Sequence, residues 1–126
     1  MNALEKAFDF VNQKTVSRNG VTLLIAPRNN VNEAYSNELQ KVSEELNGKS
    51  EEESEELFKS PEVQNRLLAT CILDWEADDG SELPPCDAEN KQKYLNNYAW
   101  FRDFVNSQSA PTDSFSRKAV ESAAKN

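Results

Sequence analysis

The chain has 126 residues, of which 37% are hydrophobic and 29% charged, a composition typical of one soluble domain. Its net charge is −8, with −13 in residues 31–90, +2 in residues 1–30 and +3 in residues 91–126. An acidic middle repels phosphate backbones and excludes ordinary nucleic-acid binding. No apolar run approaches the roughly 20 residues that span a bilayer, and no signal peptide is recognisable, so we expect a cytosolic protein without membrane contact.

The N-terminal third begins with residues 3–12, whose apolar side chains recur at three- and four-residue spacing and predict a short amphipathic helix. The pair Asn19-Gly20 then separates two β-favouring runs, which is typical of a tight hairpin with positive φ at both central residues. We expect strands near 14–18 and 21–26. Because an isolated hairpin is only marginally stable, it should pack on helices.

The acidic middle starts with an apolar stripe that predicts a helix over about 32–47, capped by Asn30 or Asn32 and stopped by Gly48. Residues 50–60 follow and contain five glutamates. This composition favours either a short, mobile helix or a charged connector.

The next start signal is Ser60-Pro61, a capping hydroxyl followed by a proline at the first helical position. Apolar residues then follow a 3.6-residue period as far as Trp75. The pattern predicts a helix over about 61–75 that is apolar over a wide arc and central to the core.

A last long helix is predicted over about 88–106, with Asp87 as its cap and no internal breaker. From residue 108 the composition changes to Ser, Ala, Thr and Lys, which predicts disorder or a weak helix at about 114–124. The fold class expected is therefore mainly α: a small single-domain helical protein with a short N-terminal β-hairpin packed on the helices. Residues 1–107 would form this domain, with the hairpin at about 14–26, and residues 108–126 a flexible C-terminal tail.

The acidic loop after Trp75 is the first place to look for chemistry. Asp74, Glu76 and Asp78 alternate like the first ligands of an EF-hand, but Gly80 comes one residue late and Pro85 stands where the bidentate glutamate belongs. The chain contains no histidine, so a triad has no imidazole base. No phosphate-binding loop is present either. We expect no catalytic residues, no metal and no cofactor, and read the loop as a stiff corner; weak divalent-ion binding at 74–82 is left open.

The two cysteines differ in their surroundings. Cys71 lies within an apolar pattern and is expected in the core, whereas Cys86 follows a proline in a loop. Nothing indicates an oxidising compartment, and two thiolates without histidine do not fill a tetrahedral zinc shell. We expect no zinc site, and a disulfide between the two cysteines is left open.

Aromatic side chains are a further group of candidate functional residues. The helix expected over 88–106 is apolar on more than one stripe, and a small domain has limited room to bury all of them. Trp and Tyr are favoured at protein interfaces, so we assign a partner-binding role to the surplus. The candidates are Trp75, Tyr94, Tyr98, Trp100, Phe101 and Phe104.

The block Arg66–Val105 resembles the tail assembly chaperones of long-tailed, siphovirus-type bacteriophages. The shared pattern is Asp74-Trp75 at the end of a helix, Asp79-Gly80, Leu83-Pro84, a capped helix from Asp87, and Trp100 followed by Arg102. The hairpin upstream is also similar, so that the likeness covers roughly residues 14–106. Cys86 departs from the pattern, where a hydroxyl or small aromatic residue is expected.

The resemblance implies a non-catalytic protein that binds and solubilises the tape measure protein in the host cell cytoplasm and is absent from the mature virion. It also implies recruitment of tail tube (major tail) subunits, for which a C-terminally extended form is one route, and a homo-oligomer. The alternative from another class is a small acidic nucleic-acid mimic that inhibits a DNA-binding protein. Its support is the −13 middle segment, although residues 50–60 look mobile for such a role.

Overall fold

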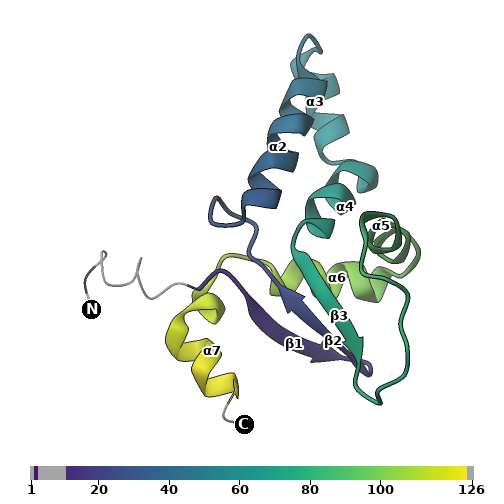
Figure 1. Cartoon of the computed structure of the whole chain (residues 1–126). Helices are drawn as coiled ribbons and strands as arrows, with labels where there is room; N and C mark the ends of the chain where they lie inside the picture. The colour runs from purple at the N-terminus through teal and green to yellow at the C-terminus, as the bar shows by residue number, and fades with distance from the viewer. Residues whose placement is uncertain (1, 3–10, 125–126) are drawn as a thin grey trace.

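The computed structural model describes residue 2 and residues 11–124 (Figure 1). Its sheet is antiparallel, in the order β1-β2-β3, with β1 at Lys14–Arg18, β2 at Val21–Ile25 and β3 at Ile72–Ala77. The helices are α2 (Glu33–Leu46), α3 (Glu51–Phe58), α4 (Pro61–Ala69), α5 (Ala88–Asn97), α6 (Ala99–Gln108), the 3-10 turn η1 (Asp113–Phe115) and α7 (Arg117–Ala124). The fold is α+β, so the mainly α class expected from the sequence is wrong. None of these described helices is long and apolar enough to cross a membrane.

The hairpin of β1 and β2 follows the prediction. Asn19 and Gly20 have φ values of 53° and 82°, and Arg18 pairs with Val21 across the turn. Glycine carries no penalty at positive φ and asparagine a small one, which is why this dipeptide determines the turn locally. The helix expected over 3–12 falls almost entirely outside the described residues.

The helix predicted over 61–75 is wrong in its second half. α4 ends at Ala69, and the chain enters β3, which pairs with β2. Ile72 and Trp75 are three residues apart, a helical spacing, yet they share one face of the sheet. The register shift between Leu24 and Ile25 explains this, because it leaves Leu73 without a partner as a β-bulge, 40% exposed.

The helix predicted over 88–106 is also wrong as one element, because it is interrupted at Tyr98. This residue has extended backbone angles, φ −126° and ψ 103°, and serves as both the C-cap of α5 and the N-cap of α6. Figure 1 shows the two helices leaving this point in different directions. Because neither glycine nor proline marks the interruption, the sequence pattern gave no sign of it.

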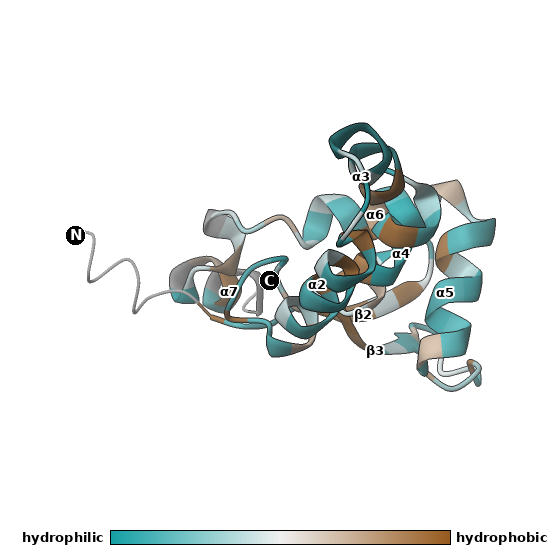
Figure 2. Cartoon of the chain, turned by 90° about the horizontal axis from the view of Figure 1, so that it is seen from above, coloured by the Kyte–Doolittle hydropathy of each residue, from teal (hydrophilic) through white to brown (hydrophobic). Residues whose placement is uncertain are grey.

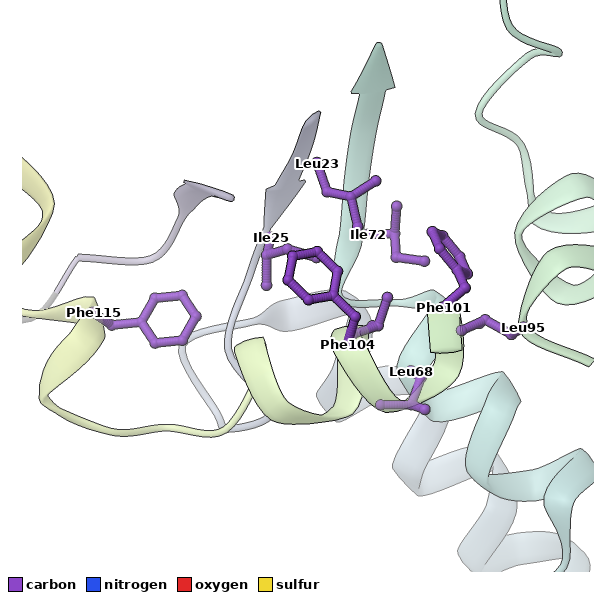
Figure 3. Packing of buried hydrophobic residues seen from close by; sticks show 9 residues of the cluster. Leu23, Ile25, Leu68, Ile72, Leu95, Phe101, Phe104 and Phe115 are labelled. Atoms are coloured by element: carbon purple, nitrogen blue, oxygen red, sulfur yellow. The ribbon is translucent and has the colours of Figure 1, made fainter. Parts of the chain in front are cut away.

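The main core lies between one face of the sheet and α6 (Figure 3). Leu23 and Ile25 of β2 and Ile72 of β3 face Phe101 and Phe104 of α6. Leu68, Leu95, Val105 and Phe115 complete this cluster. Cys71 is 0% exposed, as expected for a small core residue.

Helices α2, α3 and α4 form an arm that projects from the sheet, and the end of α4 joins it to the main core through Leu68 (Figure 1). A small core of Val42, Val63 and Leu67 holds α2 to α4. Arg66 reinforces this contact: its Nη2 lies 2.8 Å from Glu38 Oε1 and its Nη1 lies 2.9 Å from Glu45 Oε2.

The arm also contains much of the negative charge of the protein. Residues 33–69 hold ten glutamates, three lysines and one arginine, a net charge of −6 out of −8. Helix α3, capped by Ser50, has no buried residue and is mostly hydrophilic (Figure 2). Residues 72–90 add a net charge of −7, so the acidity belongs to the arm and to the segment of β3 and its following loop, while the rest of the chain is net positive.

The C-terminal segment contributes to the core. Phe115 is 0% exposed, and its carbonyl oxygen accepts a hydrogen bond of 2.7 Å from the backbone N–H of Val11. Of the two expectations for this segment, the helix at about 114–124 is found, as α7. The division of the chain at residue 107 stays a prediction, but packing continues across it.

Candidate partner-binding groove

Five aromatic side chains meet in an apolar cavity of about 240 Å³ beside the sheet. They come from β3, α5, the interruption between the helices, and α6: Trp75, Tyr94, Tyr98, Trp100 and Phe101. The wall is completed by Val21, Leu83 and Pro84. We call these eight residues the aromatic groove.

Trp75 is the fixed centre of the groove. Its indole Nε1–H donates a hydrogen bond of 2.8 Å to the carbonyl oxygen of Pro84, which holds the loop after β3 against the strand. Its ring meets Tyr94 and Phe101 edge to face, with ring centroids 5.8 Å and 6.3 Å apart. These are favourable aromatic geometries, so the floor of the groove is formed by packed side chains.

The outer part of the groove is exposed. Tyr98 is 49% exposed and Trp100 37% exposed, and Tyr98 stacks on Tyr94 at a centroid distance of 5.8 Å. Tyr98 lies at the interruption between α5 and α6, and Trp100 lies in the first turn of α6. Exposed Trp and Tyr side chains beside a preformed apolar cavity are typical of a protein-binding surface.

The structure thus brings together five of the six residues predicted to bind a partner. The sixth, Phe104, does not line the cavity; it is 7% exposed and packs beside Phe101 in the main core (Figure 3). Val21, Leu83 and Pro84 were missed by the sequence reasoning. Leu83 had a weak signal, since it is the one large apolar residue in an otherwise acidic loop.

The acidic loop closes on itself by local hydrogen bonds. Asp79 Oδ1 accepts from Ser81 N at 2.9 Å and from Ser81 Oγ at 2.6 Å, and these bonds lower the pKa of Asp79. Gly80 has φ 80° and completes the turn. Among the described residues, no three His, Cys, Asp or Glu side chains gather as metal ligands would. The loop joins a strand to a helix, and not two helices as expected.

The buried thiol of Cys71 makes stability sensitive to alkaline pH. Burial raises the pKa of Cys71 above its ordinary value of 9.0. The unfolded chain therefore loses this proton at lower pH than the folded chain, so the contribution is full below pH 9 and is lost as pH rises through the folded pKa. We expect Cys71→Ala to lose less stability than the parent chain between neutral and strongly alkaline pH, measured by urea unfolding at both. Equal losses would contradict this assignment.

A protein-family model described as "YdaY prophage protein" matches residues 30–126. The chain belongs to the YdaY prophage protein family. Its origin is therefore phage-derived, which agrees with the phage resemblance of the sequence at this coarser level. The YdaY match spans the arm and every residue of the aromatic groove except Val21. Neither the comparison with curated proteins nor that with solved structures found a match.

Proposed function

We propose that this protein is a non-catalytic phage tail assembly chaperone. It would bind and solubilise the tape measure protein and help to recruit tail tube subunits in the host cytoplasm, acting in several copies and leaving before the virion is mature. The observation that carries the proposal is the exposed aromatic groove on a protein of a phage-derived family.

The geometry suits binding to a helical chain. An apolar groove with a rigid floor takes the apolar stripe of an amphipathic helix, which is a common mode of peptide recognition. A tape measure protein is a long helical chain, so it offers many such stripes. The net charge of −8 would keep the resulting complex soluble.

Co-expression with the tape measure protein of the same prophage tests the proposal. Trp100→Ala and Tyr98→Ser remove exposed apolar surface at the groove. We expect each to weaken binding of the tape measure protein about thirtyfold, the effect of losing an interface hot spot of about 2 kcal/mol. Leu73→Ala is the matched control, since Leu73 is 40% exposed on the β-bulge and does not line the groove. Unchanged co-purification in both groove variants would show that the groove does not bind the tape measure protein.

A second candidate function, that of a nucleic-acid mimic, is supported by one observation. The glutamates of residues 51–56 lie on a capped helix of the projecting arm, and so are more regularly arranged than the sequence indicated. A mimic would bind a DNA-binding protein through α3. Binding to such a protein that DNA competes away and that survives Trp100→Ala would favour this candidate.

A further inference from the structure

A second hollow adjoins the aromatic groove. Its volume is about 370 Å³, and Asp74, Glu76 and Cys86 are among the residues that line it. We call this hollow the acidic recess. It shares one wall with the aromatic groove, formed by Trp75, Leu83 and Pro84. The two hollows are therefore direct neighbours on the surface.

The recess lies in a region of net negative charge, although the positive charge of Lys91 reaches Cys86 in its wall. Residues 72–90 contain seven carboxylates and no lysine or arginine. None of the seven forms an ion pair with a described residue, whereas Glu38 and Glu45 on the arm are paired with Arg66. The shared wall is also held in place, because Trp75 donates to Pro84. Asp74 and Glu76 are the two carboxylates that line the recess, and two carboxylates without an ion-pair partner at a fixed hollow attract a cation.

We infer that the groove and the recess form one two-part site for a protein segment that presents an apolar side chain next to a lysine or arginine. The apolar side chain enters the aromatic groove, and the cationic group enters the acidic recess beside Asp74 and Glu76. The inference rests on the proposed function. It specifies that the part of the partner that binds here is a basic amphipathic segment. Charge complementarity of this kind adds specificity and speeds association.

Two synthetic helical peptides test the inference, one with lysines flanking its apolar stripe and one with glutamines at the same positions. Titration is followed by the fluorescence of Trp75 and Trp100. At low salt we expect the lysine peptide to bind about fivefold tighter, the effect of one or two surface ion pairs, and the preference should disappear at high salt. The double variant Asp74→Asn, Glu76→Gln should lose the preference and keep its affinity for the glutamine peptide. Asparagine can still accept the hydrogen bond that Trp75 N donates to Asp74 Oδ1.

Cys86 provides a second readout, because it is half-buried in the recess while Cys71, the other cysteine of the chain, is fully buried. The lysine peptide should slow alkylation of Cys86. Equal affinities for the two peptides would overturn the inference and leave the proposed function standing, since co-purification of the tape measure protein tests that separately. Absence of binding by either peptide would also overturn it. So would slower alkylation at rising protein concentration without peptide, which would assign the site to a second copy of this chain.

Discussion

A chain that ends at Ala110 is expected to be unfolded or severely destabilised. The truncation removes Phe115, which is 0% exposed in the main core, together with the hydrogen bond from Val11 to its carbonyl oxygen. Loss of a buried phenylalanine costs about 3–5 kcal/mol, against a total stability of about 5–15 kcal/mol for a typical domain.

The truncation also leaves Lys14 without its partners. Lys14 is 8% exposed, its Nζ donates to Ser114 Oγ at 2.7 Å, and it lies 4.4 Å from the centroid of the Phe115 ring. Burial lowers the pKa of Lys14, because removing the charged ammonium group from water is unfavourable. The hydrogen bond to Ser114 and the cation–π contact with Phe115 offset part of this loss of hydration.

Urea unfolding followed by circular dichroism measures the effect. Phe115→Ala in the full chain should reproduce most of the loss, whereas Phe115→Leu should cost less than about 1.5 kcal/mol. A chain that ends at Ser116 is the matched control, since it lacks α7 but keeps Phe115, and should stay folded. A stable chain ending at Ala110 would show that residues 111–126, the larger part of the tail expected at 108–126, are dispensable.

Phe104→Ala should mainly reduce stability and Trp100→Ala should mainly reduce partner binding, although the two residues lie one helical turn apart on α6. Phe104 is 7% exposed, so its truncation leaves a cavity between α6 and the sheet and should cost about 3–5 kcal/mol. Trp100 is 37% exposed, so Trp100→Ala should cost less than about 1 kcal/mol and act mainly on partner binding.

Unfolding curves and co-purification of the tape measure protein, measured on the same two variants, separate these effects. Phe104→Leu is the control for Phe104, because it should recover most of the stability. Equal losses of stability in the two alanine variants would contradict the placement of Phe104 in the core and Trp100 at the groove.

Several features of this protein are determined locally by the sequence. Asn19-Gly20 forms the hairpin turn because these two residues tolerate positive φ. Asn32, Ser60 and Asp87 cap helices as predicted, each accepting a hydrogen bond from a backbone N–H three residues later. Such signals depend on neighbours within four residues, and so they can be read without knowing the fold. The phage origin was also indicated by the sequence; the chaperone function stays a proposal.

The strand β3, the interruption at Tyr98 and the groove were decided by tertiary structure. Ile72 and Trp75 have a spacing that suits either a helix or a bulged strand, and pairing with β2 selects the strand. Tyr98 carries no local breaker, so packing of α5 and α6 on different neighbours determines where the helix stops. The groove collects side chains from four elements, and the sequence alone contains no information on which face each presents until the sheet register and the helix directions are set.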